Sequence, residues 1–179
     1  MRFLAGLSAS LLLVALAVTG CGDDGSDDES KDTSSASSGD QAEGVTVDAC
    51  ALLTPADVET AFGSPFDDGE LSHQETGADQ CVWKSTDASE EMTFSVAVVR
   101  QDGLDSSLES SGQTVAELFE QTKAAYPNAE ALNLGDEAYA AVSEVQVLDS
   151  DTWYSLTAYL GAGVDPLDEL KQLAALAVG

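Results

Sequence analysis

The chain has 179 residues, of which 33 are acidic and six are basic, and its formal net charge at pH 7 is -27. A surface this negative repels phosphate groups, because proteins bind nucleic acid through Lys and Arg side chains that displace counterions. The composition therefore argues against nucleic acid as a partner and favours solubility as the role of the charge. Residues 45–179 are enough for one hydrophobic core, and we expect a single, monomeric domain there.

The first twenty residues have the layout of a bacterial signal peptide. Arg2 supplies the charged start, and an apolar run from Phe3 to Val18 follows that is too short for a stable membrane span. The run leads to Val18-Thr19-Gly20-Cys21, which is similar to a lipobox, where the cysteine receives a diacylglycerol before cleavage. We expect residues 1–20 to be removed and Cys21 to anchor the protein at the extracytoplasmic face of the cell membrane. Ordinary cleavage that leaves Cys21 as a free thiol is the alternative.

Residues 21–44 are rich in Asp, Glu, Ser and Gly and contain no large apolar side chain. Such a segment cannot bury enough apolar surface to order itself, so we expect a flexible, self-repelling spacer between anchor and domain. The acidic run from Asp23 to Glu29 lacks the alternating acids and the distal Glu of an EF-hand. A calcium loop is therefore the disfavoured alternative.

The domain begins with the signals of a short helix, since Thr54 is a capping residue, Pro55 suits the first turn and Gly63 ends it. A second helix follows Thr114, with Glu117 completing a capping box, and is expected to end at Pro127. A third is expected to be capped by Asp165 and to start at Pro166, and it has its apolar side chains on one face at Leu167, Leu170, Leu173, Ala174 and Ala177.

Five runs have the composition or the alternation of strands, and they cover residues 79–85, 92–99, 137–142, 145–148 and 153–160. The last three are joined by short turns, which makes them antiparallel neighbours. The segment from Ser64 to Ala78 is polar and is expected to be a loop. The predicted fold is an α+β domain, with an antiparallel sheet of about five strands covered by about three helices.

Cys50 and Cys81 are the two cysteines that remain after Cys21. An even pair in an exported chain favours a disulfide, and closing a loop of about 31 residues should stabilise the fold by roughly 3–4 kcal/mol. Metal binding by the two thiolates is less favoured, because no His lies at ligand spacing. The bond would join the first helix to the first predicted strand.

Residues with catalytic potential are few. His73, the one histidine, lies in the predicted polar loop without a second His or a free Cys nearby, so we interpret it as a surface residue. Acid clusters occur at Asp67-Asp68 with Glu70 and at Asp149 with Asp151, which in principle suit a glycosidase pair or calcium. In so acidic a chain they arise by chance, and we predict no metal, no cofactor and no enzymatic activity.

Gly161-Ala162-Gly163 precedes the last helix and superficially resembles a dinucleotide loop. Pro166 occupies the third glycine position and Asp165 would repel a phosphate, so a turn with a helix cap is the better interpretation. Aromatic residues on the strands offer a different kind of site. Trp83, Trp153 and Tyr159 form a candidate ligand platform if no helix covers them, whereas core packing is the favoured interpretation.

Three motifs together give the chain a resemblance to a known family. They are Cys50-Ala51-Leu52-Leu53-Thr54, the later Cys81-Val82-Trp83, and Gly135-Asp136-Glu137-Ala138-Tyr139, combined with the lipobox and an acidic Ser-rich spacer. The chain resembles small actinobacterial lipoproteins that carry a domain of unknown function. The resemblance implies a disulfide between Cys50 and Cys81 in an extracytoplasmic α+β domain, and it brings no catalytic residues.

The leading hypothesis is a non-enzymatic module of the cell envelope that binds a partner protein or a small apolar ligand beside its sheet. An enzyme acting on carbohydrate through paired carboxylates is one alternative, and it needs a cleft with two acids about 5–10 Å apart. An accessory lipoprotein of a transporter or sensor is the other.

Overall fold

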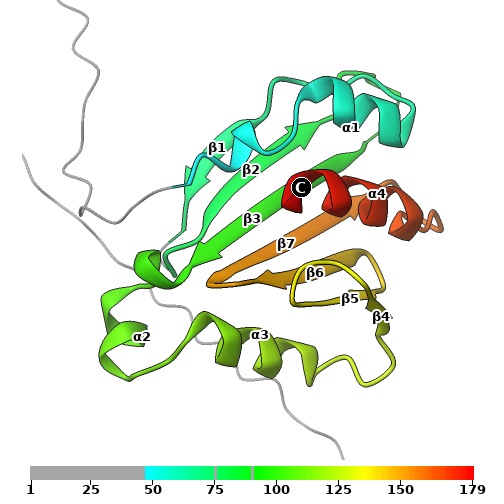
Figure 1. Ribbon diagram of the computed structural model, residues 1–179. Helices are drawn as coiled ribbons and strands as arrows, with labels where there is room; N and C mark the ends of the chain where they lie inside the picture. Colours follow the sequence, from blue (N-terminus) through cyan, green and yellow to red (C-terminus); the bar gives the residue numbers. More distant parts are fainter. Residues whose placement is uncertain (1–46, 75, 90) are drawn as a thin grey trace, which may run out of the picture. The chain divides into compact units, whose positions relative to one another are not determined.

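The computed structural model describes residues 47–74, 76–89 and 91–179. The predicted signal peptide, Cys21 and the spacer lie outside the described residues. Figure 1 shows the elements, which in chain order are η1 Ala49–Ala51, α1 Pro55–Phe62, β1 Glu70–His73, β2 Asp79–Lys84, β3 Thr93–Arg100, η2 Gln101–Gly103, α2 Ser106–Ser110, α3 Val115–Lys123, β4 Glu130–Leu132, β5 Glu137–Ala141, β6 Glu144–Asp149, β7 Thr152–Tyr159 and α4 Leu167–Val178.

The seven strands form one sheet in the order β1-β2-β3-β7-β6-β5-β4, and every neighbouring pair is antiparallel. The α+β class is confirmed, with two more strands than the sequence predicted. β1 lies inside the segment 64–78 that was expected to be a loop, and β4 precedes the third predicted strand. Both are short edge strands with largely exposed side chains, so neither is long enough to show an apolar alternation.

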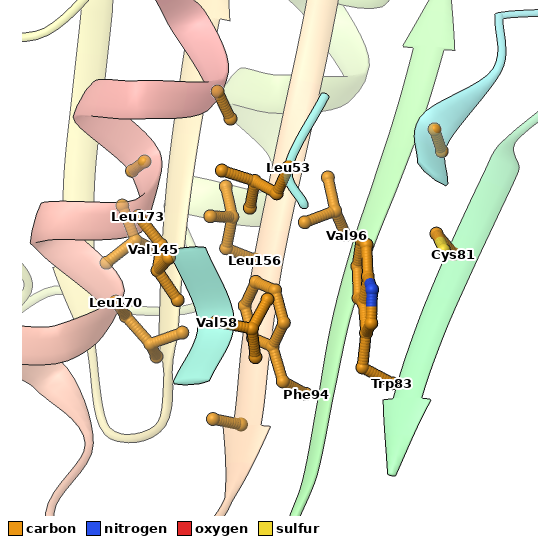
Figure 2. Packing of buried hydrophobic residues seen from close by; sticks show 14 of the residues in the cluster. Leu53, Val58, Cys81, Trp83, Phe94, Val96, Val145, Leu156, Leu170 and Leu173 are labelled. Carbon is orange, nitrogen blue, oxygen red and sulfur yellow. The ribbon is translucent and has the colours of Figure 1, made fainter. Parts of the chain in front are cut away.

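Alternate residues of the strands build what we call the first face, on which the larger core lies. Helices α1 and α4 and the turn η1 pack over it, and Figure 1 shows α1 and α4 side by side above the strands. Figure 2 shows the side chains that meet there; those with no exposed surface include Trp83, Phe94, Val96, Val145, Leu156, Leu170 and Leu173. The rings of Trp83 and Phe94 stack with their centroids 5.3 Å apart.

Helix α1 begins where the sequence predicted, and α4 begins at Leu167, one residue after the predicted start at Pro166. Thr54 and Asp57 form a capping box, in which the Thr54 backbone N–H donates to Asp57 Oδ2 at 2.8 Å. Gly63 ends α1 in the left-handed conformation with φ 73°. At α4, the Leu167 N–H donates to Asp165 Oδ1 at 3.1 Å, as expected for a side chain at a helix start.

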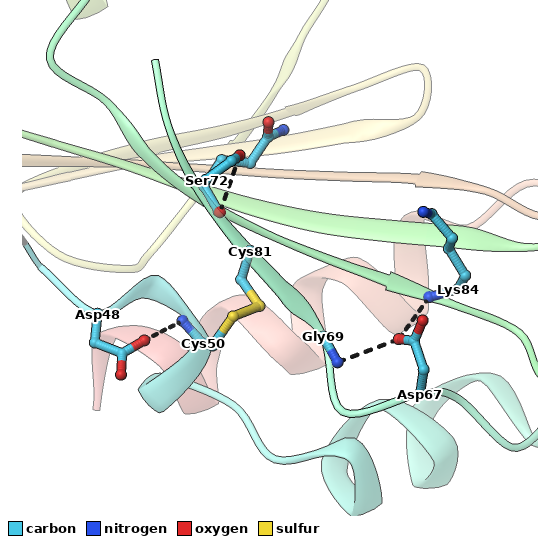
Figure 3. The surroundings of a disulfide bond; sticks show 8 residues. Asp48, Cys50, Asp67, Gly69, Ser72, Cys81 and Lys84 are labelled. Atoms are coloured by element: carbon cyan, nitrogen blue, oxygen red, sulfur yellow. Dashed lines mark hydrogen bonds between the residues drawn. A yellow bond between two sulfur atoms is a disulfide. The ribbon is translucent and has the colours of Figure 1, made fainter. Parts of the chain in front are cut away.

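The disulfide between Cys50 and Cys81 is confirmed, with the two Cα atoms 5.0 Å apart. Cys50 lies in η1 and Cys81 in β2, so the bond joins a turn before the first helix to the second strand rather than the first helix to the first strand (Figure 3). Gly69 must pass close to this bond, since a Cβ there would lie 2.7 Å from Cys81 Sγ. Its φ of 79° also favours glycine.

The second face carries the remaining alternate residues and has only partial cover. Helix α3 packs on it through Val115 and Phe119, and the Phe119 ring lies 5.5 Å from Tyr139 and 6.3 Å from Trp153. The capping box of Thr114 is present, but α3 ends at Lys123 and not at Pro127. The short helix α2 before it was not predicted, because its Ser-rich sequence has no apolar periodicity.

Candidate functional site

A cavity of about 600 Å³ opens on the second face between the sheet and α3, and we call it the Trp153 cavity. Its floor is made by β3 and β7, its wall by α3, and its ends by the segments before α2 and before β2. The described lining residues are Thr76, Ala78, Ala97, Val99, Leu104, Leu108, Leu118, Gln121, Thr122, Trp153 and Ser155. Most of these side chains are apolar, and none of them is acidic or basic. The cavity is therefore an uncharged site in a strongly acidic protein.

A buried polar network holds Trp153 in place at the floor of this cavity. The indole N–H donates to Gln146 Oε1 at 2.7 Å, and Gln146 Nε2 donates to Ser155 Oγ at 2.9 Å. Gln146 is only 3% exposed, so these bonds supply the partners that its amide needs away from water. With the Phe119 ring perpendicular to its own, Trp153 presents a fixed apolar surface to the cavity.

Beside the Trp153 cavity, the loop before β2 contacts the 3₁₀ helix η2. A Cβ at Gly77 would lie 2.0 Å from the Gly103 carbonyl oxygen, and Gly77 has a φ of 85°. Only glycine fits this position, because a side chain would collide with backbone. Beyond the contact, Leu104 is buried, and the Val115 N–H donates to Gln101 Oε1 at 2.9 Å, which secures the start of α3. The cavity is thus built on well-held elements.

The structure separates the three aromatic residues of the predicted platform. Trp83 lies on the first face with no exposed surface, so it is a core residue. Trp153 and Tyr159 share the second face but lie toward opposite ends of β7, and Tyr159 is 57% exposed. Tyr159 lines another cavity, of about 450 Å³, together with Glu144 and Tyr126. No single platform exists among them.

His73 lies on β1 and not in a loop, and half of its side chain is exposed. Its Nδ1 is 2.7 Å from Asp79 Oδ1, and the other oxygen of Asp79 accepts the Val47 N–H at 2.7 Å. Asp79 is buried, and its hydrogen bond with Val47 holds the start of the described chain against β2. The arrangement has a structural role, and the hydrogen bonds of the described residues bring no Ser or Cys nucleophile to the imidazole.

The acid cluster around Asp67 also has structural partners, and Asp151 lies beside further acids. Asp67 Oδ1 accepts the backbone N–H groups of Gly69 at 3.2 Å and Lys84 at 3.0 Å (Figure 3), while the side chains of Glu70 and Lys84 form an ion pair at 3.7 Å. Asp151 lines a polar cavity of about 500 Å³ that also holds Asp102 and Glu109. Arg100 pairs with Asp102 there at 3.0 Å, so one of these acids already has a counter-charge.

Within residues 47–74, 76–89 and 91–179, no group of three or more His, Cys, Asp or Glu side chains is placed to hold a metal ion. In the same part of the chain, no helix combines the length and the apolar character needed to cross a membrane.

Residues 16–179 match a family model described as a protein of unknown function, DUF3558. The chain belongs to this family. No curated protein and no solved structure is similar enough to the chain to match it. The family membership therefore comes without an activity, and the function of this DUF3558 chain has to be argued from its own cavities.

The sequence predicted one lining residue of the Trp153 cavity in this DUF3558 chain, Trp153 itself. It missed Leu104, Leu108 and Leu118, because the first two lie in a segment without periodicity and the third had no predicted partner. The alternation in β3 was a usable signal: Ala97 and Val99 lie on the face opposite Val96 and Val98. Small residues on one face of a central strand indicate where a cavity has room.

Proposed function

We propose that this chain is an extracytoplasmic lipoprotein, anchored through a diacylglycerol on Cys21, whose folded domain binds a small apolar ligand without catalysing a reaction. The observation that supports binding is the Trp153 cavity. Its volume of about 600 Å³ lies in the range of roughly 300–1,000 Å³ that is usual for small-molecule sites. A mostly apolar lining with a few polar groups, such as Thr122 and Ser155, is also typical of such sites.

The anchor is supported by Val18-Thr19-Gly20-Cys21, which has the small residues and the acyl-accepting thiol that lipidation requires. The family match begins at residue 16 and so includes this motif. An acidic spacer and an acidic domain are repelled by anionic headgroups, so the domain stands away from the bilayer. We accordingly group the chain with the actinobacterial lipoproteins that it resembles.

Binding can be tested with N-phenyl-1-naphthylamine, a neutral fluorophore that brightens in apolar sites. The mature chain, residues 21–179 with Cys21→Ser, is used, because it lacks both the apolar residues 3–18 and the acyl groups and so needs no detergent. We expect saturable binding that Leu118→Gln weakens by about tenfold, since an amide replaces buried apolar surface. Leu71→Gln is the matched control, because Leu71 is 51% exposed on β1 and should leave binding unchanged.

Two results would contradict an apolar ligand in this cavity. One is the absence of saturable fluorescence, and the other is binding that Leu118→Gln does not alter. Native mass spectrometry of the chain purified from its own organism then identifies what co-purifies. A small molecule supports the proposal, whereas a bound protein in its place favours the alternative of an interaction module.

The anchor has its own test, the intact mass of the chain extracted from its membrane. We expect loss of residues 1–20 and an added mass equal to a diacylglycerol with a further acyl group or a free amine. Cys21→Ala should abolish the added mass. A mature chain that begins with an unmodified Cys21 would refute lipidation.

A further inference from the structure

Glu144, at the start of β6 on the second face, has a carboxylate that the fold does not fully satisfy. Its Oε1 atom is buried and has no hydrogen-bond partner among the described residues. A hydrogen bond from the Tyr126 hydroxyl to this carboxylate raises the pKa of Tyr126, so one neutral donor is present. A buried carboxylate oxygen without a partner is costly, which makes it a candidate for recognition of a ligand.

No basic side chain among the described residues forms an ion pair with Glu144. All four described Lys and Arg residues are engaged elsewhere: Lys84 with Glu70, Arg100 with Asp102, Lys123 with Glu137 and Glu120, and Lys171 with Glu130 and Asp168. A positive charge at Glu144 would therefore come from outside this part of the chain.

Glu144 lines the cavity of about 450 Å³ that we call the Glu144 cavity. Ala141, Val142 and Ala158 give it apolar walls, and the rings of Tyr126 and Tyr159 border it. Glu144 pairs with Thr157 across the strands, so Tyr159, two residues further on the same face, is its diagonal neighbour and within reach of a ligand bound there. Aromatic faces beside a carboxylate attract cations that carry apolar groups.

We propose that the Glu144 cavity binds a small organic ammonium ion, with Glu144 as the counter-charge and the Tyr126 and Tyr159 rings against its alkyl groups. A divalent metal ion fits less well, because calcium requires six to eight oxygen ligands and one carboxylate cannot supply them. A neutral polyol would leave the carboxylate charge uncompensated. The net charge of -27 also raises the concentration of cations at the surface.

This site is independent of the Trp153 cavity. The two have no lining residue in common, and the chemistry expected of them is opposite, since one is uncharged and the other is built around a carboxylate. Failure of either proposal therefore leaves the other standing.

Isothermal titration calorimetry of the full chain in a non-ionic detergent at low salt tests the proposal. The probes are choline, a quaternary ammonium ion, and 3,3-dimethylbutan-1-ol, in which carbon replaces the charged nitrogen. We expect saturable heat from choline at concentrations up to about 10 mM and at least roughly tenfold weaker binding of the neutral alcohol. Choline binding should weaken further as salt is added.

Three variants distinguish choline binding at the Glu144 cavity from general attraction of a cation to an acidic protein. Glu144→Gln keeps the shape and removes the charge, so choline affinity should fall by about tenfold or more. Tyr159→Ala should reduce it by about threefold to tenfold, and the exposure of Tyr159 makes this variant safe for folding. Glu59→Gln, on the exposed surface of α1 over the first face, is the matched control and should bind choline as the parent chain does.

The proposal is overturned if choline gives no saturable heat, or if choline and its neutral analogue bind equally. It is also overturned if Glu59→Gln and Glu144→Gln lower the affinity alike, because the effect would then belong to net charge. Should Glu144→Gln fail to fold, an unchanged affinity in Tyr159→Ala, together with insensitivity to salt, overturns it as well.

Discussion

The two faces of the sheet come from alternate residues of the same strands, yet they differ in what covers them. On β3, Phe94, Val96 and Val98 point to the first face and are buried under α1, α4 and η1. Their neighbours Ser95 and Ala97 point to the second face, are only half-buried, and line cavities there. One strand thus supplies a closed core on one side and open binding surface on the other.

This difference has a physical cause in the side chains themselves. Large apolar residues on the first face require cover, because each gains about 1.5–3 kcal/mol when it leaves water. On the second face, Ser95 and Thr157 bond each other at 2.8 Å and tolerate water, so partial cover by α3 is sufficient. Stability should therefore depend mainly on the first face and ligand binding on the second, which the following changes can test.

Removal of the disulfide should have the largest effect, because the bond holds η1 over the first face. We expect Cys50→Ala with Cys81→Ala to lower the free energy of unfolding by roughly 3–4 kcal/mol, as measured by urea denaturation. Binding of N-phenyl-1-naphthylamine well below the melting temperature should persist, because neither cysteine lines the Trp153 cavity. Two free thiols on alkylation of the native chain without reductant would contradict the bond itself.

A matched pair of substitutions on β3 compares the faces directly. Val96 has no exposed surface, whereas Val99 is half-buried and lines the Trp153 cavity. We expect Val96→Ala to cost about 2–3 kcal/mol of unfolding free energy and Val99→Ala about 1 kcal/mol or less, because only the first leaves a sealed void. Equal losses in urea denaturation would mean that the second face is packed as tightly as the first.

The two capping boxes offer a second matched pair, with helices on opposite faces. Thr54→Ala in α1 and Thr114→Ala in α3 should each cost about 1 kcal/mol, because each removes an acceptor for a helix N–H. Only Thr114→Ala should also weaken binding of N-phenyl-1-naphthylamine, since Leu118, which lines the cavity, follows one turn later in α3. Equal probe affinity in both variants would show that α3 does not shape the cavity.

Tyr139→Phe should have the smallest effect at pH 7, and the size of the effect should grow at alkaline pH. The Tyr139 hydroxyl is buried without a partner among the described residues, so at pH 7 its removal should leave stability unchanged or raise it by up to about 1 kcal/mol. A loss of more than about 1 kcal/mol in urea denaturation at pH 7 would reveal a partner for the hydroxyl.

Above about pH 10 the same variant should resist alkali better than the parent chain. Burial raises the pKa of Tyr139, so the unfolded chain releases this proton first and the parent loses stability as pH rises past the ordinary tyrosine value. Urea denaturation at pH 7 and about pH 10.5 measures the difference, and a parent and variant that lose stability equally would contradict it.

Local signals in the sequence predicted the elements that are specified by their own residues. The caps at Thr54 and Thr114 and the alternation around Val96 were sufficient, because a helix start and a strand face are properties of a few neighbouring residues. β1 and β4 were missed, because edge strands of four and three residues are held mainly by their partners. The sequence could also have predicted that Trp83 lies on the first face, since it is two residues from Cys81 on the same strand.

The sequence by itself determined the α+β class, the pairing of Cys50 with Cys81 and the order of the main elements. Periodicity and caps are properties of neighbouring residues, and the number of cysteines can be counted directly. Only the tertiary structure decided that Trp153 and Tyr159 belong to separate cavities and that Glu144 has no cationic partner in the described part of the chain. Both facts depend on strand register and on where α3 lies across the sheet. Such contacts join residues far apart in the chain, and no local pattern encodes them.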